Sequence, residues 1–229
     1  MITIHIDSRE DTAFLSAVYI GLKDNKTYIN PTREEVESIL KENPTERVLL
    51  MGHGSQAGLF SSDWRGYVID RQNVHLLRGR EVIGIWCWAK KFAESTELKG
   101  FFTSMFISNI SEYKGFFPNT SFTNEQDIFD EITFFSKEIN TLITNDIPMD
   151  TWVEHLNEVG HKEKDYVKFN YDALAYYDGR EVPSDEDKAN TSFYYFLNDV
   201  DSETLMSFTI KEILEYAYTE GYKAGQAEM

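Results

Sequence analysis

The stretch EVIGIWCWAKKF, residues 81–92, joins two segments of opposite character, and the only cysteine of the chain lies where they meet. Residues Val82 to Trp86 are continuously apolar, which is typical of a strand that is buried on both faces of a sheet. A charged segment with helical character begins at Ala89. The stretch therefore predicts a buried strand followed by a helix, with Cys87 at the carboxyl end of the strand.

A second stretch, RVLLMGHGS at residues 47–55, has a similar construction. Val48 to Met51 form a short apolar strand, and the sequence Gly-His-Gly follows it directly. Ligand sites in open, mostly parallel sheets lie at the carboxyl ends of the strands. If the two strands are parallel neighbours, His53 and Cys87 emerge at the same edge of the sheet.

Strands and helices alternate along most of the chain. Further strands are predicted at residues 1–6, 66–70, 100–109, 166–178 (one or two strands) and 192–197. Helices are predicted over residues 31–44, from residue 89, over residues 123–143, after Pro148 and from about Ser202. Because the strands are continuously apolar and alternate with helices, we expect an α/β fold in which a mostly parallel sheet is covered by helices on both faces.

Capping boxes mark the starts of two of these helices. Thr32 and Glu35 form a T-x-x-E box at the first, and Thr123 and Gln126 can form a similar box at the third. In the helix after Pro148, the residues expected to be buried are Trp152, Leu156 and Val159.

The chain is expected to form one main domain, residues 1–180, and a small C-terminal α/β extension, residues 181–229, packed on the same domain. The segment 179–192 is polar and rich in charge, and we expect a loop there. With 229 residues, 41% of them hydrophobic, the chain is long enough to bury a full core.

The chain carries 39 Asp and Glu against 22 Lys and Arg, which gives a formal net charge of −17. A surface that grips phosphates needs clustered Lys and Arg, so we expect no nucleic acid as a partner. An acidic surface favours solubility and attracts a basic partner or substrate.

The N-terminal residues 1–11 contain neither a basic segment nor an apolar segment of the kind that forms a signal peptide. No apolar run approaches the roughly 20 residues of a membrane span. A single cysteine excludes an intrachain disulfide and leaves too few thiolates for a structural zinc site. We therefore expect a cytoplasmic protein with no membrane partner.

His53 and Cys87 are the residue types that cysteine-dependent catalysis needs. The thiolate is the nucleophile, and a neighbouring imidazole generates or stabilises it. Gly52 and Gly54 let the backbone turn sharply and let a substrate carbonyl come close. The N–H groups of Gly54 and Cys87 are candidates for an oxyanion hole. A lone cysteine in an apolar strand is also commonly an inert core residue, and that alternative stays open.

The order of apolar strand, His-Gly, spacer, apolar strand, Cys and helix resembles the caspase-like fold of the clan CD cysteine peptidases, which include caspases, gingipains, clostripain and the bacterial CHAT domains. The resemblance covers about residues 1–180 and is carried by VLLMGHGSQAGLF and EVIGIWCWAKKFAESTELKGFFTSMFISN. It implies a three-layer α/β/α fold around a sheet of about six strands. It also implies cleavage of peptide bonds, with His53 as general acid or base, Cys87 as nucleophile and Gly54 in the oxyanion hole.

The chain departs from the family pattern at two points. Trp86 precedes the cysteine, where the family usually has Ala. The spacing from His53 to Cys87 is also shorter than the roughly 50 residues of caspases. The chain is therefore closer to the compact bacterial members than to a true caspase.

In the family, the end of the first strand often lines the pocket for the residue before the scissile bond. The resemblance therefore implies that Asp7 and Arg9 contact the substrate. Asp7 would favour Arg or Lys at that position, and Arg9 would favour Asp. Trp86 and Trp88 flank the nucleophile and are expected to narrow the substrate cleft.

The function predicted from these features is that of a cysteine endopeptidase, which acts on a protein or peptide substrate and needs neither a metal nor another cofactor. A regulatory protein is a second candidate partner. One alternative is a catalytically inactive module of the same fold that binds a protein. Another is an unrelated α/β enzyme or small-molecule binder whose site the sequence does not mark.

Overall fold

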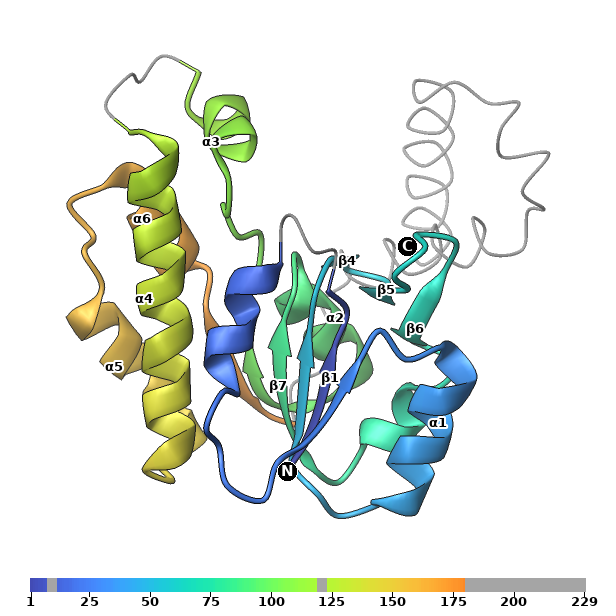
Figure 1. Ribbon diagram of the computed structural model, residues 1–229. Coiled ribbons are helices and arrows are strands. Elements are labelled where there is room, and N and C mark those ends of the chain that lie inside the picture. The colour runs from blue at the N-terminus through green and yellow to red at the C-terminus, as the bar shows by residue number, and fades with distance from the viewer. Residues whose placement is uncertain (8–11, 119–122, 180–229) are drawn as a thin grey trace, which may run out of the picture. The chain divides into compact units, whose positions relative to one another are not determined.

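The computed structural model of the protein describes residues 1–7, 12–118 and 123–179, which belong to one compact unit, Met1–Glu181. Its centre is a six-stranded sheet with the strand order β2-β1-β3-β7-β8-β9 (Figure 1). The strands are Ile2–His5 (β1), Lys26–Ile29 (β2), Val48–Met51 (β3), Glu81–Ile85 (β7), Lys99–Phe102 (β8) and Ala175–Asp178 (β9). Neighbouring strands run parallel except β8 and β9, which are antiparallel. The expected mostly parallel sheet is therefore confirmed.

Helices cover both faces of the sheet, as expected for a three-layer α/β/α arrangement (Figure 1). One face carries η1 (Ala13–Val18), α3 (Ile110–Phe116), α4 (Glu125–Thr144), α5 (Trp152–Val159) and α6 (Asp165–Asp172), with η3 (Met149–Thr151) leading into α5. The other face carries α1 (Arg33–Glu42), η2 (Val74–Leu77) and α2 (Ala89–Thr96).

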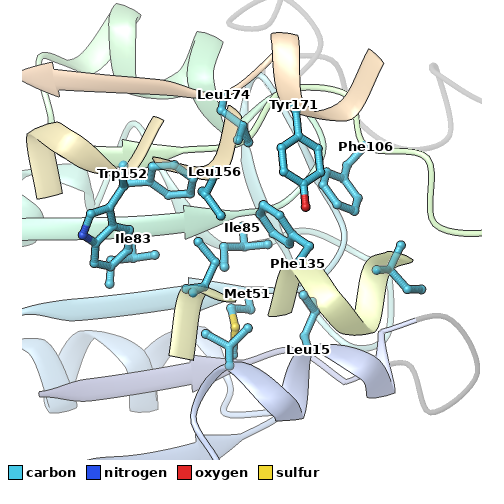
Figure 2. Packing of buried hydrophobic residues seen from close by; sticks show 14 of the residues in the cluster. Leu15, Met51, Ile83, Ile85, Phe106, Phe135, Trp152, Leu156, Tyr171 and Leu174 are labelled. Atoms are coloured by element: carbon cyan, nitrogen blue, oxygen red, sulfur yellow. The ribbon is translucent and has the colours of Figure 1, made fainter. Parts of the chain in front are cut away.

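The side chains of each central strand point alternately into two cores, which is why β3 is apolar at every position and β7 is apolar from Val82 to Ile85. In β3, Leu49 and Met51 point toward α4, whereas Val48 and Leu50 point toward α1. Figure 2 shows the core on the α4 side, where Met51 and Phe135 belong to one buried cluster.

A second, smaller sheet follows β3 directly. It is antiparallel and consists of β4 (Gly54–Ser55), β5 (Gly58–Phe60) and β6 (Tyr67–Asp70). The strand predicted at residues 66–70 is therefore present, but it belongs to this second sheet. Two hydrogen bonds of 2.6 and 2.9 Å from the guanidinium of Arg33 to the carboxylate of Asp70 connect β6 to α1.

The capping box predicted at the start of α1 is present. The box predicted from Thr123 and Gln126 is wrong by one residue, because α4 is capped by Asn124, with Asp127 completing the box. Asn caps a helix as well as Thr does, since either side chain offers an oxygen to the backbone N–H three positions later. The helix therefore begins one residue later than the Thr123 box predicts.

Three further predictions need correction. Residues 166–172 of the predicted strand region 166–178 form most of α6, and only its end forms β9; the helix buries Tyr166, Val167, Asn170 and Tyr171 at helical spacing. The strand predicted over 100–109 ends at Phe102. Val159 is half-buried at the end of α5, whereas Trp152 and Leu156 are fully buried.

The predicted C-terminal extension, residues 181–229, lies outside the described residues. So do most of the predicted loop 179–192, the strand at 192–197 and the helix from Ser202.

Candidate active site

The register of three neighbouring strands brings the candidate residues to one level. His5 of β1 pairs with Met51 of β3, and Met51 pairs with Ile85 of β7. His53 and Cys87 each lie two positions beyond this register. Since β3 and β7 are adjacent and parallel, both residues leave the sheet at the same edge, as expected.

The turn after β3, residues 52–54, is called the His turn below. Gly52 has a φ of 145°, and a Cβ atom there would lie 2.7 Å from the carbonyl oxygen of Ile6. The turn is held on both sides, because the N–H of Gly52 donates to the carbonyl of Ile85 (3.2 Å) and the carbonyl of His53 accepts from the N–H of Phe60 (3.0 Å). The backbone at His53 is therefore fixed by the strands beside it.

The turn after β7, residues 86–88, is called the Cys turn. The carbonyl of Trp86 accepts from the hydroxyl of Thr103 (2.9 Å) and from the N–H of Ala89 (3.2 Å). Trp88 has a left-handed backbone with a φ of 69°, and it is the N-cap of α2. Cys87 is half-buried and lies two residues before the first residue of this helix.

The two turns contact each other through the indole of Trp86. Its Nε1–H donates to the carbonyl of Ser55 (3.1 Å), and a Cβ atom added to Gly54 would lie 2.2 Å from its Cδ1. Gly54 was expected to make room for a substrate carbonyl, but in the structure it makes room for Trp86. Because Trp86 is only 2% exposed, its side chain offers almost no surface to a substrate.

His53 and Cys87 line one pocket, which has a volume of about 30 Å³, together with Thr12, Thr103, Ser108 and Glu112 and with several apolar residues. Glu112 lies in α3 and its Oε2 atom accepts from the N–H (2.8 Å) and the hydroxyl (3.1 Å) of Ser108. Sequence reasoning missed Glu112. The available signal was Asn109 three positions before it, which marks a helix start just beyond the end of β8.

The surroundings of Cys87 favour the protonated thiol. Burial raises the pKa of Cys87; a backbone hydrogen bond at Phe106 lowers it, and the negative charge of Glu112 raises it further. In the substrate-free protein at neutral pH, the group is therefore mostly a thiol. Nucleophilic attack would require its proton to move to a base, and His53 is the imidazole that lines the same pocket.

The N–H of Gly54 is directed away from the small sheet. His53 and Phe60 are joined by a hydrogen bond, so the next pair, Gly54 and Leu59, is a non-hydrogen-bonded pair of the antiparallel ladder. The N–H groups of such pairs point outward from the ladder. This orientation is compatible with the expected role of Gly54 as an oxyanion donor.

Two further predicted substrate residues, Asp7 and Trp88, are not part of the pocket lining. Asp7 lies at the same edge of the sheet, where Asn30 binds its backbone N–H (2.8 Å) and carbonyl (3.1 Å). Trp88 is 39% exposed, with the Nζ atom of Lys91 5.5 Å from its ring centroid. Among the described residues that line the pocket, neither Asp7 nor Trp88 is found. Arg9 lies outside the described residues.

A series of aromatic side chains in contact extends from His53 onto the small sheet. The ring centroid of His53 lies 4.8 Å from that of Trp64, which is 57% exposed. Trp64 in turn contacts Phe60, which stacks on Tyr67. The imidazole is thus placed between the pocket and an aromatic surface.

Comparison of the sequence with protein-family models and with curated proteins found no match. Within residues 1–7, 12–118 and 123–179, no helix is long and apolar enough to cross a bilayer. In the same part of the chain, no group of three or more His, Cys, Asp or Glu side chains is arranged to hold a metal ion.

Proposed function

We propose that the protein is a cysteine peptidase of the caspase-like fold, in which His53 and Cys87 form the catalytic dyad. The observation that carries the proposal is their common placement. Both residues lie two positions beyond a register pair of adjacent parallel strands, and both line one pocket. A six-stranded, mostly parallel sheet with helices on both faces agrees with the fold that the family resemblance implies.

The proposed reaction has two steps. In the first, the Cys87 sulfur attacks the carbonyl carbon of the peptide as its proton moves to His53, and the C–N bond then breaks as His53 returns the proton to the leaving amine. In the second, water attacks the thioester, His53 takes a proton from that water, and the departing sulfur recovers it. The N–H groups of Gly54 and Cys87 are the proposed donors to the oxyanion in both steps.

The direct test is cleavage of a peptide library by the full-length protein and its variants. We expect Cys87→Ala to abolish cleavage and His53→Ala to reduce it by about 10²- to 10⁴-fold, the usual contribution of general acid–base catalysis. His75→Ala is the matched control, because His75 is exposed in η2, away from the pocket. Full activity of either dyad variant would refute the proposal.

A catalytically inactive interaction module is the second candidate. The raised pKa of Cys87 and the small pocket beside it are the observations that favour it. The two candidates differ in how Cys87 reacts with a peptidyl acyloxymethyl ketone. A peptidase would be labelled much faster by this reagent than by iodoacetamide, and His53→Ala would remove the difference; an inactive module would react slowly with both reagents.

A further inference from the structure

Three hydroxyl groups line the pocket, and each donates its proton in a hydrogen bond to an acceptor within the protein. The hydroxyl of Thr12 donates to the carbonyl of Ile6 (3.3 Å), and that of Thr103 donates to the carbonyl of Trp86 (2.9 Å). The hydroxyl of Ser108 donates to the carboxylate of Glu112 (3.1 Å). A hydroxyl has one proton and two lone pairs, so toward a ligand these three oxygens act as acceptors.

Glu112 adds a negative charge to this lining. An ionised carboxylate only accepts hydrogen bonds, and the two bonds from Ser108 fix its position at the pocket. The carboxylate is also close enough to Cys87 to act on the thiol electrostatically. A charge of this sign opposes formation of the thiolate, so it is unfavourable for the nucleophile unless a cation neutralises it.

The size of the pocket limits which cation fits. Its volume of about 30 Å³ is small, because on the same measure a cavity needs roughly 10–15 Å³ to hold one water molecule, so only a compact group enters. A primary ammonium is a compact point charge with three donors, whereas a guanidinium is a larger planar fork with five. A lining of three hydroxyl oxygens and one carboxylate matches the ammonium in charge, donor number and size.

We propose that the pocket formed by Thr12, Thr103, Ser108 and Glu112 beside Cys87 is a binding subsite for a primary ammonium group of the substrate. As a statement about substrate, this inference rests on the proposed peptidase function. The ammonium can come from a lysine side chain near the scissile bond or from the free α-amino group of a peptide. Binding of either would neutralise Glu112 and thereby favour the thiolate, so the correct substrate would help to activate the nucleophile.

The first experiment uses no peptide and needs no peptidase activity. The probes are methanethiosulfonates, from which the Cys87 thiolate displaces methanesulfinate to form a mixed disulfide. Because Cys87 is the only cysteine, the mass of the full chain reports this reaction alone. Three reagents are compared in about 0.15 M salt: aminoethyl, trimethylammonioethyl and sulfonatoethyl. The first two carry the same positive charge, so the net charge of −17 attracts them alike, and they differ in the size of the cation.

We expect the aminoethyl reagent to react with Cys87 about 10- to 100-fold faster than the other two, relative to their rates with a free thiol. This range corresponds to the usual strength of a hydrogen bond to a charged group. Glu112→Gln should remove most of this preference, while it keeps an oxygen for the bonds from Ser108. Glu125→Gln, an exposed glutamate in the first turn of α4, is the matched control and should change nothing.

Equal rates for the two cationic reagents in the wild-type protein would overturn the proposal, and this comparison needs no variant to fold. A preference that survives in Glu112→Gln would also overturn it, because the preference would then come from another part of the protein.

The second experiment identifies the source of the ammonium. N-acetylated peptides with Lys, Arg or Gln next to the scissile bond are compared with lysine-free peptides that have a free N-terminus. Faster cleavage of the acetylated Lys peptide assigns the subsite to a side chain, and faster cleavage of the free-amine peptide assigns it to the α-amino group. If no peptide is cleaved but the reagent selectivity holds, the subsite stands and the peptidase proposal fails. If peptides are cleaved without any preference for an ammonium group, the peptidase proposal stands and the subsite proposal fails.

Discussion

The His turn and the Cys turn leave neighbouring strands at the same level, yet they are built from opposite kinds of residue. Glycine lies on both sides of His53, and tryptophan lies on both sides of Cys87. Gly52 and Gly54 have backbone or side-chain neighbours that would meet a Cβ atom closer than 3.0 Å. Trp86 is buried, and Trp88 adopts a left-handed backbone without being glycine.

The difference shows that the conformation of the His turn depends on the packing of the Cys turn against it. The indole of Trp86 fills the volume that Gly54 leaves, and it binds the carbonyl of Ser55. The His turn therefore cannot shift without disturbing Trp86, which is the residue before Cys87. This packing couples the positions of the imidazole and the thiol. A substitution in either turn should disrupt it.

The largest effect is expected from Gly54→Ala. The new Cβ atom would lie 2.2 Å from Cδ1 of Trp86 and 2.6 Å from the carbonyl oxygen of Gly58, and neither neighbour has a flexible end that could give way. Overpacking of this kind should lower the free energy of unfolding by about 3 kcal/mol or more. Denaturant unfolding measures the change.

Gly66→Ala is the matched control, because a Cβ atom at Gly66 has no neighbour within 4 Å. It should leave the free energy of unfolding within about 0.5 kcal/mol of the wild-type value. Equal stability of the two variants would show that Trp86 can move away, and the coupling between the turns would then be weak.

Trp86→Phe should have the next largest effect. Phenylalanine keeps an aromatic ring but removes the Nε1–H that donates to Ser55 and leaves part of the indole volume empty. The lost hydrogen bond and the small cavity together should lower the free energy of unfolding by about 2 kcal/mol. If the proposed function holds, the rate of cleavage should also fall, because the His turn loses its link to the Cys turn. Unchanged unfolding and cleavage would show that the indole N–H has no role.

Local sequence signals were sufficient for the two strands that carry the site. The apolar runs at β3 and β7 predicted the strands, and Gly-His-Gly and Cys87 fell at their carboxyl ends because the apolar pattern stops there. The T-x-x-E box at α1 was equally local. These features depend on residues close together in the chain, so a single sequence contains them.

Features that depend on distant contacts were missed. β2 is an edge strand with mostly exposed side chains, so it has no apolar pattern. The aromatic residues of α6 suggested a strand, but tertiary packing selected a helix. The role of Gly54 depends on its contact with Trp86, and the role of Glu112 depends on the residues that line the pocket with it. Most of these residues are distant in the sequence. They come together only when the strands are aligned in the sheet.

The end of β1 also carries a histidine, His5, which is buried, whereas His53 lines the pocket. His5 is 1% exposed, and its Nδ1 atom lies 3.1 Å from the hydroxyl of Tyr19. Burial lowers the pKa of His5, and this effect outweighs the opposing contributions of Asp7 and of the backbone at Thr12. The folded protein therefore keeps His5 neutral to a lower pH than the unfolded chain does.

This difference predicts an acid-dependent loss of stability. As the pH falls below about 6.5, the unfolded chain binds a proton at His5 before the folded protein does, so the free energy of unfolding should decrease. His5→Gln should show a weaker decrease over the same range, whereas the exposed His75→Gln should show the wild-type decrease. Identical pH profiles for all three proteins would mean that His5 does not contribute to the pH dependence.

The smallest effect should come from the backbone of the Cys turn at Trp88. A left-handed conformation costs a non-glycine residue roughly 1–2 kcal/mol, and glycine avoids this cost. Trp88→Gly and Trp88→Ala both remove the indole, so their difference isolates the backbone. We expect the glycine variant to be more stable than the alanine variant by about 1 kcal/mol in denaturant unfolding.

The same pair of substitutions at Lys137, an exposed position inside α4, should give the opposite order, because glycine is less favourable than alanine in a helix by about 1 kcal/mol. An alanine variant at position 88 that equals or exceeds the glycine variant would show that the left-handed turn relaxes once the indole is gone. Cys87 would then owe its position to the packing of Trp88 as well as to Trp86. The reversed order at the two positions would instead show that the backbone itself holds the thiol at the edge of the sheet.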